Sequence, residues 1–291
     1  MAASETLQFT LSGITTGSVY AVVALGFTIV FNASGVVNFA HGEFVMLAGL
    51  LAVWLVALHL PLWAAAAGAV VIVAGIAAAV HALTVRSIER TAGHFTMIMV
   101  TLGVAMVLQV LAEVIFGTEA QALPAFSGDG AIRVFTATIT LQALWVLAGA
   151  AVLMAGLYVF FTRTRAGQAM LATAENREAA GLVGIDTRRV SLHAYVLGCG
   201  VGALAGVLVT PMTAAVYTQG LVYTLKGFAA AALGGFGSPV GAVIGGLALG
   251  LLEAFSAGVV SSGYQDLIAL IALIGILMFR PGGIVGTRVL G

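Results

Sequence analysis

The stretch Asn38–Phe44, with the sequence NFAHGEF, places an amide, an imidazole and a carboxylate between two strongly apolar segments. The segment YAVVALGFTIVF, from Tyr20 to Phe31, precedes it, and VMLAGLLAVWLVAL, from Val45 to Leu58, follows it. A polar or ionisable group inside a membrane is costly unless it faces protein or a water-filled cavity. The pattern therefore predicts two membrane helices separated by a break that faces the interior of the protein.

The composition extends this interpretation to the whole chain. Of 291 residues, 61% are hydrophobic and 8% are charged, whereas a soluble domain usually has about 25% charged residues. Runs of roughly 20 apolar residues match the hydrocarbon core, and they are continuous, unlike the alternating segments of a β-barrel. These features predict an all-α polytopic membrane protein with a single transmembrane domain, residues 1–291. The net charge of zero gives no indication of nucleic-acid binding.

We expect about eight transmembrane helices in the lipid bilayer. A ninth apolar piece, Leu225–Phe236, is too short to cross as a straight helix and contains several glycines, so we expect a broken or re-entrant segment there. The eight expected spans are Leu7–Phe31, His41–Leu60, Leu62–Val85, Phe95–Gly117, Ile139–Phe161, Val190–Val216, Val240–Val260 and Leu267–Phe279.

The arginines indicate the orientation of these spans. They gather in a short loop at Arg86–Arg90, in the long loop Arg163–Val190 and in the C-terminal segment from Arg280. Cytoplasmic loops of membrane proteins carry an excess of Lys and Arg, so these segments should face the cytoplasm. The segment Thr118–Thr138 should then lie outside, and so should the N-terminus if Leu225–Phe236 counts as a crossing.

The loop Arg163–Val190 is the most polar part of the chain. Strong helix formers run from Met170 to Leu182, and Gly184 suits the end of this helix. Such a helix would lie along the membrane surface, either as a solvated connector or as a docking surface for a cytoplasmic partner.

Within this loop, Glu178-Ala179-Ala180 and Gly184 match the EAA-x-x-x-G pattern of permease subunits in bacterial ABC importers. In that family the pattern forms a coupling helix that sits in a groove of the ATPase subunit. The run Gly13–Gly49, which contains NFAHGE, resembles the LivH type of permease from branched-chain amino-acid importers. The resemblance also covers residues 163–186, 228–253 and 279–286.

The resemblance implies an ABC importer permease fold in the inner (cytoplasmic) membrane of a bacterium. It implies translocation of branched-chain amino acids, or of related small polar solutes such as amides, urea and aromatic acids, into the cytoplasm. The implied partners are a second, LivM-like permease in a heterodimer, two cytoplasmic ATPase subunits and a periplasmic solute-binding protein. ATP and Mg would be bound by the ATPases, and this chain would bind no cofactor.

The sequence lacks the motifs of an enzyme. No G-x-x-x-x-G-K-[ST] phosphate loop occurs, and Lys226 is the only lysine, so the chain should not hydrolyse ATP itself. No HExxH motif or pair of cysteines suggests a metal site. We therefore expect a transport subunit without catalytic or metal-binding residues.

The NFAHGEF stretch supplies the first candidate pathway residues. Gly35 can break the preceding helix, and Asn38 suits the N-cap of a helix that starts at Phe39. Asn38 and His41 would then share a helix face, and Glu43 would lie elsewhere around the axis. Two interpretations of these polar groups are equally acceptable: they line the solute pathway, or they stabilise the kink.

A second break shares these features. Gly235 and Ser238 lie between two apolar segments, Leu225–Phe236 and the glycine-rich span that starts at Val240. Transporters often carry helix breaks at matching places in two halves, so we predict an internal repeat whose two breaks meet near the pathway. Gly235 and Ser238 are therefore candidate pathway residues too.

Other functions and roles remain open for the charged residues in the apolar runs. Lys226 is expected at the outer interface, where lysine side chains reach the headgroups, and Glu253 is expected to hydrogen-bond across helices. An alternative function is an ion- or proton-coupled secondary transporter that uses His41, Glu43 and Glu253 as a relay. A passive channel or scaffold is a further alternative, and an intramembrane enzyme has no visible nucleophile–base pair.

Overall fold

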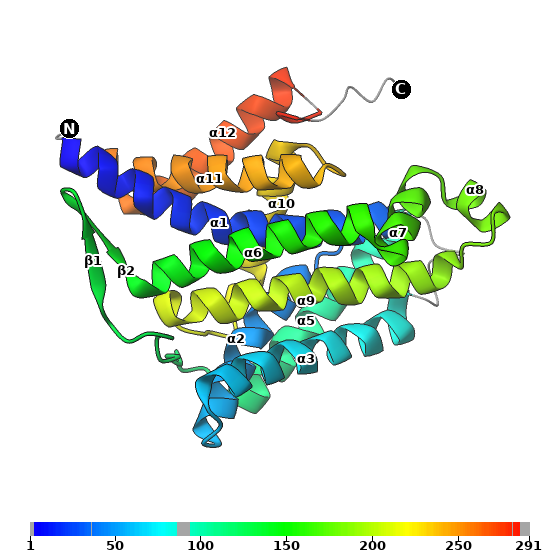
Figure 1. Cartoon of the computed structure of the whole chain (residues 1–291), viewed down its shortest axis with the longest axis horizontal. Helices are drawn as coiled ribbons and strands as arrows, with labels where there is room; N and C mark the ends of the chain where they lie inside the picture. The colour runs from blue at the N-terminus through cyan, green and yellow to red at the C-terminus, as the bar shows by residue number, and fades with distance from the viewer. Residues whose placement is uncertain (1–2, 36, 86–93, 281, 286–291) are drawn as a thin grey trace.

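The computed structural model describes residues 3–35, 37–85, 94–280 and 282–285, and most of them lie in long, packed helices (Figure 1). The helices are α1 (Ala3–Ser34), α2 (His41–Ala57), α3 (Leu62–Val80), which continues as a π-helical turn (His81–Val85), α5 (His94–Phe116), α6 (Leu141–Arg163), α7 (Arg165–Glu175), α8 (Arg177–Leu182), α9 (Thr187–Thr213), α10 (Gln219–Gly234), α11 (Pro239–Val259), the short turn Ser262–Tyr264 and α12 (Gln265–Phe279). The strands are β1 (Ala131–Val134) and β2 (Ala137–Thr140).

The all-α polytopic fold predicted from the composition is confirmed. Within the described residues, seven helices are long and apolar enough to cross a membrane, and each overlaps a span expected from the sequence. The helix α2 is apolar but has 17 residues, fewer than the roughly 20 needed to cross along the membrane normal. The short piece Leu225–Phe236 coincides with the greater part of α10, a helix that begins at Gln219.

The two ends of the bundle differ in chemistry. The N-terminal end of α1 and the β1–β2 hairpin lie at one end, and the arginine-bearing α7 and α8 lie at the other (Figure 1). Gln8 of α1 exchanges two hydrogen bonds, of 2.9 and 3.1 Å, with the backbone of Thr138. The arginine-bearing end is expected to be cytoplasmic, so the start of α1 and the hairpin, at the opposite end, are expected outside, and this orientation stays a prediction. The loop Arg86–Arg90 and Arg288 lie outside the described residues.

The hairpin within the outer part of the chain was not expected from the sequence. Its strands pair antiparallel, with Ala131 opposite Thr140 and Val134 opposite Ala137. Each strand has four residues, which is too short for a clear alternating pattern. Phe135 at the turn is 89% exposed and takes a left-handed backbone conformation, with φ of 54°.

The helix α1 forms the centre of the bundle and packs along α11 and α9. Glycines make this packing close, since a Cβ atom placed on Gly17 would lie 2.9 Å from the Cα atom of Leu247 in α11. Gly26 of α1 faces Gly198 of α9, and a Cβ atom on either would lie 2.7 Å from the carbonyl oxygen of the other. Helices in lipid associate through such close backbone contacts.

Replacing Gly198 with alanine should destabilise the protein, because the added methyl group would overlap the backbone of Gly26 and push α1 and α9 apart. We expect Gly198→Ala to lose about 1–3 kcal/mol of unfolding free energy, seen as a lower thermal midpoint in detergent. Gly200→Ala is the matched control in the same helix, because a methyl group there meets no atom within 4 Å. Equal midpoints for the two variants would contradict close packing of α1 on α9.

Candidate functional site

The first helix break lies between α1 and α2. The helix α1 ends at Ser34, followed by Gly35 with φ of +72°, and α2 begins at His41. The prediction that Asn38 caps a helix starting at Phe39 is wrong. The Asn38 side-chain oxygen instead accepts a hydrogen bond from the Ala40 N–H, at 3.1 Å. This local turn competes with helix formation, so α2 begins only at His41. Asn38 therefore lies outside the helix and does not share a helix face with His41.

His41 occupies a slot between three helices. Its ring is fully buried and packs against Phe27 of α1, with ring centroids 4.6 Å apart. A Cβ atom on Gly26 would lie 2.6 Å from the ring, and one on Gly202 of α9 would lie 3.0 Å from it. Among the described residues, neither ring nitrogen makes a regular hydrogen bond, and the backbone of Val23 is the polar group that the ring approaches. His41 therefore serves as packing between α1, α2 and α9 in this conformation.

Glu43 joins α2 to the beginning of α10. The residue is 2% exposed, and its carboxylate lies against Gly220, where a Cβ atom would overlap it. Gly220 belongs to the first turn of α10, where backbone N–H groups lack helix partners and carry partial positive charge. This position brings the Glu43 carboxyl group close to the beginning of α10, where among the described residues its Oε2 atom has no hydrogen-bond partner.

Thr224 of α10 was not predicted as a site residue, but its side chain forms hydrogen bonds with the backbone at the first break. Its hydroxyl accepts a hydrogen bond from the Gly42 N–H at 3.0 Å and donates one to the Phe39 carbonyl at 3.2 Å. Both groups lie at the start of α2, where backbone groups have no hydrogen-bond partner within the helix. The signal in the sequence was a single hydroxyl in an apolar run, which is too common to identify a partner 182 residues away.

The second break connects α10 to α11. Gly235 and Gly237 have φ of +107° and +88°, and Ser238 caps α11 by accepting a hydrogen bond from the Gly241 N–H at 3.0 Å. The side chain of Asn32, near the end of α1, donates to the Gly237 carbonyl at 2.9 Å. The buried Gly235 and half-buried Ser238 thus lie beside the cytoplasmic end of α1.

Phe228 bridges the two breaks. Its ring stacks on Phe39 of the first break, with centroids 5.8 Å apart, and contacts Phe236 of the second, at 5.2 Å. Asn38, His41 and Glu43 are each at most 3% exposed, so they face protein in this conformation. Among the described residues, Asn38 Nδ2, both His41 ring nitrogens and Glu43 Oε2 have no hydrogen-bond partner, so the kink-stabilising role and the pathway role both stay predictions.

The cytoplasmic segment consists of two helices. The predicted single helix from Met170 to Leu182 is wrong, because Asn176 interrupts it and caps α8 by accepting a hydrogen bond from the Ala179 N–H at 2.9 Å. Gly184 follows α8 with φ of +88°, which confirms it as the end of this helix.

The EAA-x-x-x-G residues lie at the tip of this segment. Glu178, Ala179 and Gly184 are exposed, and Ala180 is buried. Beside them, Leu182 is 89% exposed and Val183 is 78% exposed, although both are aliphatic. Nothing in the sequence distinguishes these two residues from other aliphatic residues, since exposure of an apolar side chain is decided by the fold.

Three charged residues, Lys226, Glu253 and Asp266, lie together between α10, α11 and α12. The prediction that Lys226 reaches the outer headgroups is wrong: its side chain is 14% exposed and pairs with Glu253 of α11 and Asp266 of α12. The expected cross-helix hydrogen bond of Glu253 is confirmed, since the Tyr20 hydroxyl of α1 donates to it at 2.8 Å. In the part of the chain that the structure describes, no group of His, Cys, Asp and Glu side chains could hold a metal ion.

Comparison of this chain with known proteins identifies a family of similar sequences. A family described as the permease component of branched-chain amino acid transport systems matches residues 9–277. The chain is 34% identical to the high-affinity branched-chain amino acid transport permease LivH of Escherichia coli K12 and 32% identical to BraD of Pseudomonas aeruginosa. Each match covers 96% of this chain and 95% of the relative.

One solved structure has a similar fold. PsaBC from Streptococcus pneumoniae, in complex with Fab, superposes with a TM-score of 0.54 over 94% of this chain and 92% of that chain. The two sequences are 13% identical, so this likeness concerns the fold alone.

Thr224→Val should weaken the first break, because it removes the hydroxyl that serves the Gly42 N–H and the Phe39 carbonyl while keeping the shape of the side chain. Leaving buried backbone groups unpaired costs about 1–3 kcal/mol, so the thermal midpoint in detergent should fall. Thr28→Val is the matched control: Thr28 is equally buried, but its hydroxyl bonds only to the carbonyl of Ala24 in its own helix. A midpoint for Thr224→Val equal to that of Thr28→Val would exclude this role.

Proposed function

The chain belongs to the family of permease components of branched-chain amino acid transport systems, and we propose that it carries leucine, isoleucine and valine into the cytoplasm. It is a multi-pass permease subunit of an ABC importer in the bacterial inner membrane. The proposal of these solutes rests on relatives whose names state branched-chain amino acid transport. Related small polar solutes such as amides, urea and aromatic acids are the other candidates.

One observation carries the proposed coupling to ATP: the exposed aliphatic tip at Leu182 and Val183 on the arginine-rich end of the bundle. Exposed apolar side chains outside the membrane mark surfaces that other proteins cover. Glu178, Ala179 and Gly184 surround this tip, and Ala180 holds α8 to the rest of the segment. These residues would fill a groove on an ATPase subunit.

The family implies ATPase and solute-binding partners in general. We propose that two ATPases dock on two permeases, this chain and a LivM-like one, and that a periplasmic protein delivers the solute to the outer end. ATP and Mg would be bound by the ATPases, and this chain would supply no catalytic group and no cofactor site.

The contacts of α7 and α8 offer a route for movement. Met170 of α7 is buried in the same apolar cluster as Phe27 and Ala33 of α1. Arg177 of α8 donates a hydrogen bond of 3.5 Å to the Ala33 carbonyl, near the end of α1. A displacement of the tip by the ATPases would therefore reach α1, the central helix. Packed interfaces of this kind shift between two arrangements during alternating access.

Replacing Leu182 with arginine should prevent ATPase docking without affecting folding, because the side chain is 89% exposed and supports no packing. We expect Leu182→Arg to lose the co-purifying ATPase subunits and ATP-driven leucine uptake while keeping its thermal midpoint. Phe135→Arg is the matched control, because Phe135 is also 89% exposed but lies at the opposite end of the bundle. Full retention of bound ATPase by Leu182→Arg would refute the docking proposal.

The positive φ of Gly184 gives a milder test of the same segment. An L residue in this conformation costs about 1–2 kcal/mol, so Gly184→Ala should distort the end of α8. We expect fewer leucine molecules imported for each ATP hydrolysed by the reconstituted complex. Gly181→Ala is the control, since a methyl group at either position meets no atom within 4 Å but Gly181 lies inside α8. The same import ratio in both variants would contradict this prediction.

A secondary transporter would behave differently in this assay. It would accumulate solute in vesicles that contain an ion gradient and no ATPase subunits. Such accumulation would replace the ABC importer proposal by the alternative.

A further inference from the structure

Three charged side chains and a tyrosine from four helices form a cluster inside the bundle. The Lys226 ammonium of α10 pairs with a carboxylate oxygen of Glu253 and, at 2.6 Å, with one of Asp266. The Tyr20 hydroxyl donates to the other Glu253 oxygen at 2.8 Å, and Lys226 lies 5.5 Å from the centre of the Tyr20 ring. Lys226 and Glu253 are 14% and 7% exposed, whereas Asp266 is 69% exposed. The cluster is therefore reachable from one side.

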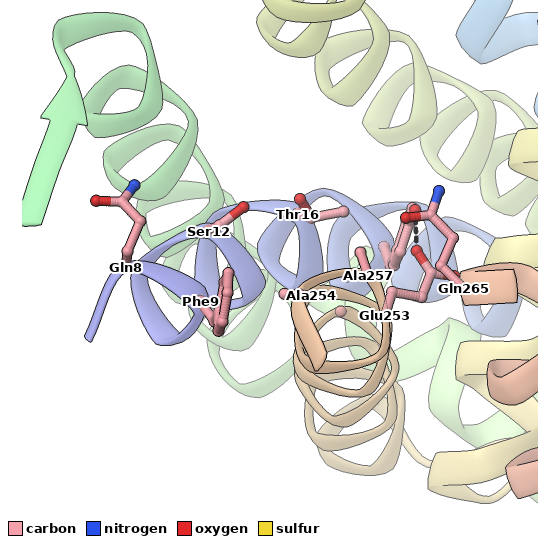
Figure 2. Close-up of a pocket in the computed structure, with 11 residues that line it drawn as sticks. Gln8, Phe9, Ser12, Thr16, Glu253, Ala254, Ala257 and Gln265 are labelled. Atoms are coloured by element: carbon pink, nitrogen blue, oxygen red, sulfur yellow. Dashed lines mark hydrogen bonds between the residues drawn. The ribbon is translucent and has the colours of Figure 1, made fainter. Parts of the chain in front are cut away.

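An open cavity of about 450 Å³, with a mixed polar and apolar lining, reaches Tyr20 and Glu253 of this cluster. Gln8, Ser12, Thr16 and Tyr20 line it from α1, at a spacing of four residues that places all four on one helix face. Figure 2 shows Gln8, Ser12 and Thr16 in sequence along α1, with Glu253 and Gln265 grouped together at the Thr16 end. Since Gln8 is bonded to the outer hairpin, this polar row runs from the outer end of the bundle to the charges.

An apolar cavity of about 210 Å³ adjoins the same charges. Glu253 lines both cavities. The remaining lining of the smaller cavity consists of Lys226 and Asp266 with the aliphatic side chains of Val222, Leu225, Ala229, Leu249, Ala269 and Leu270. The site therefore presents a cation, two anions and an aliphatic wall next to each other.

We propose that this cluster is the solute-binding site of the permease for a zwitterionic α-amino acid with an aliphatic side chain. Lys226 receives the α-carboxylate, Glu253 and Asp266 receive the α-ammonium, and the cavity at Leu225 and Leu249 receives the side chain. This inference rests on the proposed function as an amino-acid importer. It moves the pathway away from Asn38, His41 and Glu43 to the face of α1 that carries Ser12 and Thr16.

The chemistry of a zwitterion suits an ion pair. A neutral amino acid can exchange the Lys226–Glu253 contact for two contacts of its own, and the total charge of the site does not change. A solute with only a carboxylate would add a third anion to a site that holds one cation and two anions, and a buried anion without a partner costs several kcal/mol. The cluster would thus reject a simple carboxylic acid that has the same aliphatic chain.

A structural role alone explains the cluster poorly. A buried ion pair contributes little to stability compared with apolar residues of the same volume, so packing does not require one. Ionisable groups within membrane proteins mark solute or ion routes by default.

The test uses the complete importer in proteoliposomes, with both permeases, the ATPases and the binding protein, and measures ATP-driven uptake of radiolabelled leucine. The triple variant Lys226→Met, Glu253→Gln and Asp266→Asn removes all three charges and leaves none unpaired. We expect its uptake to fall by about tenfold or more, since charge-assisted contacts to the solute are lost. Its thermal midpoint and its bound ATPase subunits should match the wild type, which would show that the loss is not a loss of folding or assembly.

The controls separate recognition from structure. Glu113→Gln removes a half-buried carboxylate of α5 that belongs to neither cavity, and it should keep wild-type uptake. Wild-type uptake by the triple variant would overturn the binding site and leave the proposed function intact. Absence of ATP-driven branched-chain amino acid uptake by the wild type would overturn the proposed function, and the binding site with it.

Discussion

Hydrocarbon offers no water to a backbone N–H or carbonyl group, so a broken membrane helix survives only where protein supplies the missing partners. This chain contains two such breaks, and α10 serves both. Thr224 near its beginning bonds to the backbone on either side of the first break, and its end forms the second. The packing around α10 therefore decides how the two breaks are placed, and with them the directions of α2 and α11.

Close contact between helices depends on glycine at positions that face another backbone. Gly26 and Gly198 allow α1 to touch α9, and Gly17 allows it to touch α11. Because α1 is enclosed in this way, it connects the outer hairpin, through Gln8, with the cytoplasmic tip, through Ala33 and Arg177. The helix α1 thus extends from the outer end, where the solute would arrive, to the cytoplasmic end, where the ATPases would dock.

The polar residues of the bundle divide into two kinds. Asn38, His41 and Glu43 are buried among α1, α9 and α10, and Asn38 Nδ2, both His41 ring nitrogens and Glu43 Oε2 have no hydrogen-bond partner among the described residues. The residues around Lys226 and Glu253 border cavities and combine both signs of charge. The first kind attracts attention in the sequence because its members lie within six positions of each other, whereas the second is scattered over four helices.

The sequence by itself determined the class, the approximate spans and the sites of both breaks, because these follow from local composition and from short patterns. The orientation and the coupling role of Glu178 stay predictions. The sequence did not determine the side-chain contacts between residues that are far apart in the chain. Lys226 was expected at the headgroups, since its partners Glu253 and Asp266 lie 27 and 40 residues further along the chain. Only the tertiary structure decided which polar groups are enclosed and which border a cavity, because helix packing, not local sequence, sets the neighbours of each side chain.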